Sequence, residues 1–186
     1  MIKRRIMGNK VDPLQPEQIR EIVESIRAFM LSLSPRHSED GYVNIVDFIE
    51  ELHNRELIEL EVCESSDLPH DYANATPSQK KVSVRQEVYH QAARGEARAR
   101  FTMAHELGHL VLHANVIPKY AQSQAPSSHH YTEDVEWQAN EFAAWLLVTP
   151  HDPSKLKTPK LIADNFGVSL EMAGYQWRKL KEAGYI

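Results

Sequence analysis

Apolar residues recur at steps of three and four along much of the chain, the spacing that places them on one face of a helix. Residues 16–33 show this pattern, and Pro35 ends it because the residue before a proline avoids helical geometry. Residues 44–54 repeat the pattern over a shorter length. The sequence therefore predicts two amphipathic helices. Their expected inward residues are Ile19, Ile22, Val23, Ile26, Phe29, Met30 and Leu33 in the first and Ile45, Phe48, Ile49 and Leu52 in the second.

Alternating apolar and polar residues then predict strands. Residues 57–62 alternate apolar and acidic side chains, and residues 81–85 place Val82 and Val84 on one face. A short strand is expected over residues 72–75. The strand over residues 81–85 is expected to present an open edge, to which an extended substrate could pair by strand addition.

The next two helices are predicted from their capping residues. One covers residues 102–113, with Thr102 as a candidate N-cap, and a loop over residues 118–130 follows it. The other is expected to begin at Thr132 and to run to Val148, just before Pro150.

The C-terminal region resembles a helix-turn-helix. Thr158 and Pro159 form a cap and first-turn pair, Gly167 follows the first helix, and Ser169 caps the second. Taken together, the elements predict an α+β protein with a helical core, a small β-sheet and a C-terminal helix-turn-helix-like segment.

The composition is that of an ordinary globular protein. Of the 186 residues, 42% are hydrophobic and 25% are charged, which allows a buried core without disulfide bonds. We expect an N-terminal amphipathic helix and arm over residues 1–38, a core over residues 39–150 and the helix-turn-helix-like segment over residues 151–186.

Charge and cysteine content bear on partners and compartment. The net charge of −5 makes nucleic acid an unlikely partner and argues against binding to an anionic membrane surface. Cys63 is the only cysteine, which fits a reducing compartment. No apolar run approaches the roughly 18 residues that cross a bilayer, and the basic N-terminus lacks the apolar stretch of a signal peptide. These features predict a cytoplasmic protein without a membrane partner.

His105 and His109 stand four residues apart in a predicted helix. That spacing corresponds to about 40° of rotation and about 6 Å of rise, so both imidazoles project from one face and can bind one ion. Neutral imidazole is a good zinc ligand. Glu106 is angled away from the ligands and can take a proton from an activated water, which is the chemistry of H-E-x-x-H. Apolar neighbours such as Leu107 predict that the helix is buried, where paired histidines need a partner.

A catalytic zinc site also needs a third protein ligand and an open position for water. A histidine ten positions after the first is absent, because that residue is Asn115. The alternative is a carboxylate from the following helix, where Glu136 is the leading candidate and the small residues Ala139 and Ala143 permit close approach. Asn140, one turn beyond Glu136, could hydrogen-bond a ligand. The competing carboxylates are Glu133, Asp134 and Glu141.

His113 extends the stripe of histidines by about another 6 Å, so one ion would hardly be shared by all three. We expect it to be a structural or rim histidine, with substrate binding or transition-state polarisation as the alternative. An additional donor to the developing oxyanion is also expected. The candidates are His113, Tyr89, His129, His130 and Tyr131.

Two longer strings carry a resemblance to a known family. They are Arg-Phe-Thr-Met-Ala-His-Glu-Leu-Gly-His-Leu-Val-Leu-His, which ends at His113, and Glu-Trp-Gln-Ala-Asn-Glu-Phe-Ala-Ala-Trp-Leu-Leu-Val-Thr-Pro, which begins at Glu136. Together they resemble the ImmA/IrrE metallopeptidases and are far more specific than H-E-x-x-H alone. The family often has a methionine just before the final proline, where this chain has threonine. A looser resemblance extends from about residue 40 to the end.

The resemblance implies a gluzincin-like zinc peptidase with a zincin-like core. It implies that Zn2+ is bound by His105, His109 and Glu136, with Glu106 as the general base that passes a proton from the attacking water to the leaving amine. Members of the family cut, or are thought to cut, helix-turn-helix repressors of phage, mobile-element or stress-response genes. The implied function is therefore an intracellular endopeptidase with such a repressor as its protein substrate.

Two other functions stay open as alternatives. The same cleft could hold a repressor or antitoxin without cutting it, although the intact Glu106 argues against a catalytically silent binding module. The C-terminal helices could also contact DNA. However, the last helix begins with Leu170, Glu171 and Met172, where a DNA-reading helix places basic and amide residues. We expect a structural or repressor-docking role for this segment.

Overall fold

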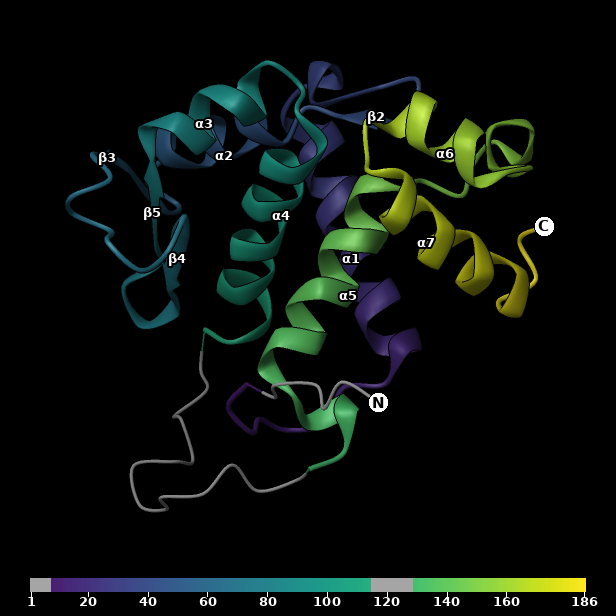
Figure 1. Cartoon of the computed structure of the whole chain (residues 1–186), viewed down its shortest axis with the longest axis horizontal. Coiled ribbons are helices and arrows are strands. Elements are labelled where there is room, and N and C mark those ends of the chain that lie inside the picture. Colours follow the sequence, from purple (N-terminus) through teal and green to yellow (C-terminus); the bar gives the residue numbers. More distant parts are fainter. Residues whose placement is uncertain (1–7, 115–128) are drawn as a thin grey trace.

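The computed structural model describes residues 8–114 and 129–186, so most of the predicted loop over residues 118–130 lies outside the described residues. Two helices, α4 (Ala97–Leu112) and α5 (Val135–Leu147), lie side by side at the centre. The three strands of the main sheet lie on one side of this pair and the two C-terminal helices on the other (Figure 1). The fold is α+β, as predicted. The remaining helices are α1 (Pro16–Leu33), α2 (Ile45–Asn54), α3 (Gln86–Ala93), α6 (Pro159–Phe166) and α7 (Leu170–Glu182), with short 3-10 turns η1 (Pro35–His37), η2 (Pro77–Gln79), η3 (Tyr131–Glu133) and η4 (Pro153–Leu156).

α1 has the predicted bounds and packs its apolar face against α5. The inward assignment is wrong for Phe29, which is 39% exposed, while Arg27 of the same helix is buried. The Arg27 guanidinium donates to the backbone oxygens of Trp145 and Leu146, each at 2.8 Å. These oxygens belong to the last turns of α5, where a helix leaves carbonyl groups without intrahelical partners. α1 therefore holds the C-terminal end of α5 as well as covering its side.

The main sheet has three strands in the order β3 (Glu59–Cys63), β5 (Lys81–Arg85) and β4 (Ala73–Thr76). β3 is parallel to β5, and β4 is antiparallel to it. The prediction of an open edge over residues 81–85 is wrong, because β5 is paired on both sides and both of its valines are fully buried. The edge strand next to α4 is β4. A separate two-stranded ladder joins β1 (Ser38–Glu39) to β2 (Tyr42–Val43).

α4 begins five residues before the predicted start. Thr102 lies inside the helix, and its hydroxyl donates to the backbone oxygen of Arg98 at 3.1 Å instead of capping the N-terminus. The chain leaves α3 through Gly95, whose φ of +85° is the left-handed conformation that glycine adopts without strain. The alanine- and arginine-rich residues after it are good helix formers, which explains the earlier start.

α5 is capped by Asp134 and not by Thr132. The Asp134 carboxylate accepts from the backbone N–H of Trp137 at 2.7 Å, the N-cap bond that satisfies a first-turn donor. Thr132 lies within η3, one turn before the helix.

The C-terminal helices begin at the predicted caps, Thr158 and Ser169. They are fixed to the core by Arg100 of α4, which is 1% exposed and donates to the backbone oxygens of Phe166 at 2.7 Å and Gly167. Gly167 has a φ of +60°, and a Cβ there would collide with the Arg100 guanidinium. Glycine is therefore required at the end of α6 by both conformation and space.

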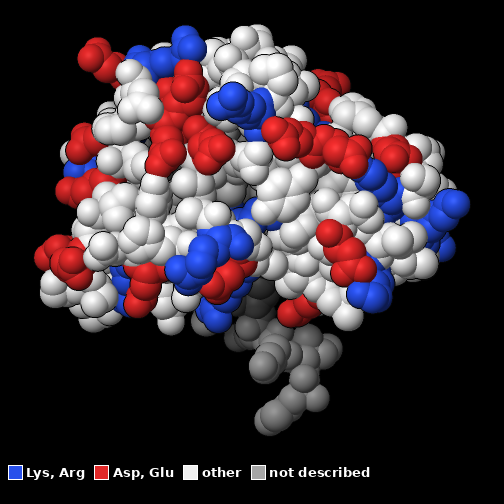
Figure 2. All heavy atoms as spheres, turned by 90° about the horizontal axis from the view of Figure 1, so that it is seen from above, with Lys and Arg blue, Asp and Glu red and all other residues white. Residues whose placement is uncertain are grey.

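The molecular surface carries charges of both signs. On the face shown in Figure 2, acidic and basic side chains are interspersed over the described residues. Among those residues, no helix combines the length and the apolar character needed to cross a membrane.

Candidate metal centre

His105 and His109 project from α4 toward Glu136 in the first turn of α5. The two histidine Nε2 atoms are 3.0 Å apart. Oxygen atoms of the Glu136 carboxylate lie 3.2 Å from Nε2 of His105 and 3.7 Å from Nε2 of His109. The three residues that the sequence predicts as metal ligands therefore form one cluster. One potential ligand atom from each residue lies within 4.8 Å of the other two.

The spacing of these atoms fits a tetrahedral zinc ion. Two ligand atoms at about 2.0–2.1 Å from one zinc ion lie about 3.3 Å apart in tetrahedral geometry. The three separations fall on either side of that value. Two imidazoles and one carboxylate also form a donor set that zinc uses in catalytic sites, which leaves one position open.

Asn140 fixes the orientation of His105. The Oδ1 atom of Asn140 lies 3.0 Å from Nδ1 of His105. An amide oxygen can only accept, so Nδ1 of His105 carries the proton and donates it. The lone pair on Nε2 then faces the cluster, which is the tautomer that a metal ligand needs.

His109 is oriented by a longer chain of hydrogen bonds. The Nε2 group of Gln138 donates to the backbone oxygens of Asp12 at 2.8 Å and Thr132 at 2.7 Å, which identifies Oε1 as the acceptor for Nε2–H of His113 at 3.0 Å. His113 therefore accepts at Nδ1, and Nδ1–H of His109 donates to it over 3.1 Å. This leaves the Nε2 lone pair of His109 facing Glu136.

The protonation of the cluster follows from burial and from these bonds. Burial lowers the pKa of His113 to about 4, which keeps it neutral, as the chain of hydrogen bonds requires. In the absence of a metal ion, hydrogen bonds from His105 and His109, when these rings carry a proton on Nε2, hold the pKa of Glu136 well below its usual range, against the opposing effect of desolvation. For His105, burial acts to lower the pKa, but Glu136, Glu106 and Asn140 together raise it.

Glu106 lies beside the cluster and not within it. It is 8% exposed, and this burial raises the pKa of its carboxyl group. The backbone of Ala75, in the edge strand β4, has a smaller and opposite effect on this pKa. A carboxylate with a raised pKa, held next to the ligands, has the properties of a general base.

The close approach of α4 and α5 depends on small residues, as the sequence predicts from Ala139. The opposing position in α4 is Gly108. A Cβ added there would lie 3.2 Å from the backbone oxygen of Ala139 and 3.0 Å from Cδ1 of Phe142. These contacts bring the first turn of α5, with Glu136, within reach of the two histidines.

The other acidic candidates have different roles. Glu133 pairs with Lys10 at 2.9 Å, and Asp134 caps α5. Glu141 is buried on the far side of α5, where it accepts from Nε1 of Trp145 at 2.8 Å and pairs with Lys179.

A cavity of about 510 Å³ opens over the cluster and is bordered by β4, α4 and the first turn of α5. Its lining also includes Asn9 and Val11, which sequence reasoning did not identify. The segment that contains them is fixed to the start of α5: the backbone N–H of Gly8 donates to the Asp134 carboxylate at 2.8 Å, and the N–H of Val135 donates to the backbone oxygen of Asn9 at 3.1 Å. In both contacts the N-terminal segment uses its backbone, and no side-chain pattern in that segment signals them.

Of the five candidates for an oxyanion donor, His113 lines this cavity and the other four do not. Tyr89 donates to Glu50, and this bond together with burial raises the pKa of Tyr89 to about 12. His130 is bonded to Thr132 at 2.7 Å in η3.

Comparison with known proteins agrees with the geometry. The family model Peptidase_M78, described as an IrrE N-terminal-like domain, matches residues 60–178, which is more than half of the chain. The match includes the whole of the histidine and glutamate cluster and most of α7. No curated protein sequence matches the chain.

Proposed function

The chain belongs to the Peptidase_M78 family of IrrE N-terminal-like domains, and from this premise we propose that it is a zinc-dependent endopeptidase. His105, His109 and Glu136 would hold the zinc ion, and Glu106 would act as the general base. The observation that carries the proposal is the spacing of the three ligand atoms, which suits one tetrahedral ion.

The residues have distinct parts in the proposed reaction. A bound zinc ion would supply the Lewis acidity that polarises the peptide carbonyl and lowers the pKa of water. The Glu106 carboxylate accepts a proton as water adds to the carbonyl carbon. It then delivers that proton to the amide nitrogen as the C–N bond breaks, so water is consumed and an acid and an amine are formed. Asn140 and His113 keep the two imidazoles in the tautomers that leave Nε2 unprotonated.

The substrate would bind as an added strand on β4. This strand is paired with β5 on one side, and its other side lines the cavity at Ala73, Asn74 and Ala75. An extended peptide can pair with the backbone of such an edge. A peptide held there would lie along the cavity that Ala75 of β4 and Glu106 of α4 both line.

We propose a helix-turn-helix repressor as the substrate. The support is the family and the strings that carry the resemblance. We also propose residues 39–150 as the peptidase core, between the N-terminal arm and helix and the C-terminal segment. The interspersed surface charges, and the exposed Leu170 and Glu171 at the start of α7, favour a protein over DNA as the partner.

The decisive test compares Glu106→Gln with the wild type. Each protein is loaded with zinc, assayed for bound metal and incubated with helix-turn-helix repressors from the same genome, beginning with any that a neighbouring gene encodes. We expect cleavage by the wild type, none by Glu106→Gln, and equal zinc content. The matched control is Glu21→Gln, an exposed position in α1 that should cleave at the wild-type rate. Equal cleavage by Glu106→Gln would refute the assigned base. Stable binding of the repressor by the wild type without cleavage would identify a binding module instead.

A further inference from the structure

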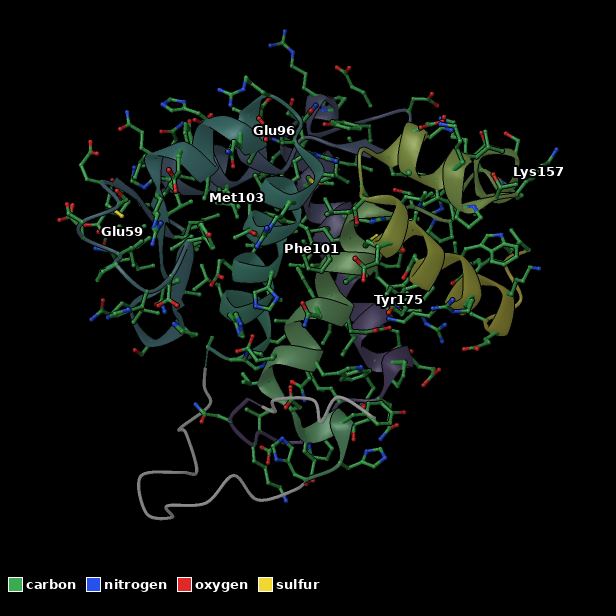
Figure 3. All side chains as sticks on the ribbon, in the orientation of Figure 1. Glu59, Glu96, Phe101, Met103, Lys157 and Tyr175 are labelled. Carbon is green, nitrogen blue, oxygen red and sulfur yellow. The ribbon has the colours of Figure 1, made fainter. Side chains whose placement is uncertain are left out.

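The cavity over the metal cluster has a second wall besides β4. This wall is the N-terminal segment of residues 8–14, of which Asn9 and Val11 line the cavity. The two walls are attached to different helices, because β4 packs against α4 and the segment is bonded to the start of α5. Figure 3 shows the segment, in purple, beside the start of α5, whereas the sheet lies beyond α4. The proposed reaction does not use this wall.

The segment pairs with residues 133–135 as a short antiparallel ladder. Lys10 is the bridge partner of Asp134, and the N–H of Val135 donates to the backbone oxygen of Asn9 at 3.1 Å. Asn9 therefore stands opposite Val135. Side chains that stand opposite each other share a face of the ladder, and both of these residues line the cavity. Asn9 thus uses its backbone for the ladder and presents its side chain to the cavity.

The side-chain amide of Asn9 is available to a ligand. Asn9 is exposed, and its amide makes no hydrogen bond with the other residues that the structure describes. Asn140, by contrast, is engaged by His105. An asparagine amide offers one oxygen that accepts and one NH2 group that donates, so it can pair with both the N–H and the C=O of an extended chain.

The other wall, β4, turns backbone groups toward the cavity. The N–H of Arg85 donates to the backbone oxygen of Tyr72 at 3.0 Å, which makes these residues a hydrogen-bonded pair. Such pairs alternate along an antiparallel ladder, so the N–H and C=O groups of Ala73 and Ala75 point away from β5. Both alanines line the cavity. An extended chain can therefore pair with β4 along one of its two edges.

A chain paired with β4 has a second edge, which faces away from that strand. The N–H and C=O groups on this edge lose water when the chain enters the cavity, and each then needs a partner. The described residues that line the second wall ahead of the ligand Glu136 are Asn9, Val11 and Val135, and among them only Asn9 has a polar side chain. Its amide can replace the lost water at one residue of the bound chain.

We propose that Asn9 is a substrate-binding residue, whose amide pairs with the main chain of an extended peptide that is paired with β4 along its other edge. The two walls then hold the peptide from both edges beside the metal cluster. Because the contact is with main-chain groups, it does not depend on the side chains of the peptide. The identity of the bound peptide as a substrate rests on the proposed peptidase function, whereas the pairing of Asn9 with an extended chain does not.

The experiment measures binding of unfolded chains to the zinc-loaded Glu106→Gln protein, so that cleavage does not interfere. The probes are fluorescein-labelled oxidised insulin B chain and fluorescein-labelled carboxymethylated α-lactalbumin, which have unrelated sequences. Fluorescence anisotropy gives their dissociation constants with and without the additional change Asn9→Ala. The matched control is Asn54→Ala, an exposed asparagine at the end of α2. With Glu106 intact, kcat and KM for the insulin chain are measured for the wild type and Asn9→Ala.

We expect Asn9→Ala to weaken the binding of both probes by about tenfold, because two hydrogen bonds to the peptide are lost. It should raise KM by about tenfold and leave kcat unchanged, since the pairing is the same in the ground state and the transition state. Bound zinc and the Tm should stay at their wild-type values, because the side chain takes no part in the ladder. Asn54→Ala should change none of these quantities. A merely structural asparagine would lower the Tm when replaced.

Absence of binding of either probe to the Glu106→Gln protein, or unchanged binding after Asn9→Ala, would overturn the inference. Weaker binding of one probe alone would also overturn it, because the contact would then be with a side chain of that probe. A fall in kcat at unchanged KM would place the amide at the reacting carbonyl group instead. Failure of the peptidase itself would show separately, as binding that depends on Asn9 without cleavage by the zinc-loaded wild type.

Discussion

Replacement of Gly108 by alanine tests whether the contact between α4 and α5 sets the geometry of the metal centre. Glycine inside a helix is less favourable than alanine by about 0.5–1 kcal/mol, so the substitution should stabilise the protein if nothing lies near the new methyl group. At Gly108 that methyl group would lie 3.0 Å from Cδ1 of Phe142 and 3.2–3.3 Å from backbone atoms of Ala139. Ordinary carbon contacts are about 3.5–4.0 Å, so α5 must move by several tenths of an ångström.

The gain in helix propensity stabilises the protein and the steric contact with α5 destabilises it. The steric contact should be the larger effect. Forcing a methyl group into a packed core costs about 1–3 kcal/mol, which exceeds the gain in helix propensity. We expect Gly108→Ala to lose about 1 kcal/mol of unfolding free energy, or about 2–4 °C in Tm at this chain length. Because α5 carries Glu136 and zinc sites tolerate about 0.2 Å in ligand distances, zinc affinity should fall about tenfold or more.

Gly174 in α7 is the matched control, because a Cβ there meets nothing within 4 Å. Gly174→Ala should gain about 0.5–1 kcal/mol and leave zinc binding unchanged. Thermal unfolding and competition with a chromophoric zinc chelator measure the two quantities on both variants. If Gly108→Ala stabilised the protein as much as Gly174→Ala and bound zinc as tightly as the wild type, the argument from helix contact would be wrong.

Three further substitutions and one metal experiment test the remaining contacts. Gly8→Ala would place a Cβ 2.6 Å from Cγ of Glu136, so zinc affinity should fall about tenfold or more; an unchanged zinc titration would contradict this. Asn140→Leu removes the acceptor for His105 Nδ1 and should weaken zinc binding by about 10–100-fold; wild-type affinity in the chelator competition would refute its role. Arg100→Met leaves three backbone oxygens without their donor and should lower the unfolding free energy by about 3–5 kcal/mol in urea titrations; a loss below about 1 kcal/mol would refute its role in fixing α6. Zinc at 100 times its dissociation constant should stabilise the chelated protein by about 2.7 kcal/mol, and no rise in Tm would exclude a bound ion.

The elements that the sequence predicted well are those with a local signal. α1 and β5 have the predicted bounds, because a three-to-four or a two-residue period is visible over their whole length. The proximity of His105 and His109 was also predictable from a local signal, because residues four apart in a helix lie on the same face. Glu136 joins these two residues in the cluster. Asn140 lies one helical turn after Glu136, so it was expected to reach a ligand. Its Oδ1 does accept a hydrogen bond from Nδ1 of His105.

The errors arose where two local signals competed. Thr102 and Thr132 both have a side chain that can cap a helix, yet neither does so. Helix-forming residues before Thr102 extend α4 toward Gly95. At α5 the stronger acceptor, Asp134, takes the backbone N–H of Trp137. Pairing of β5 on both sides was equally hidden, because one strand does not reveal its neighbours.

The sequence contains no signal that predicts the long-range partners of buried polar side chains. No pattern in the sequence marks Arg27 or Arg100 as buried, but both are buried and donate to backbone oxygens at the ends of α5 and α6. A cation is favourable at a helix C-terminus, yet its sequence position says nothing about which helix it reaches. These two arginines explain how α1 and the C-terminal helices are fixed to the core.

The metal centre therefore depends on parts of the chain that the family match does not include. The match begins at residue 60, whereas Gly8 lies against Glu136, Asp12 accepts from the Gln138 that orients His113, and Arg27 holds the far end of α5. Each contact acts on the position or the tautomer of a candidate ligand without supplying one. The candidate ligands can thus be named from a short motif, while the N-terminal segment and α1 contribute to their geometry together with the contact between α4 and α5. A construction of this kind permits the surroundings of the site to differ among chains that share the same three ligands.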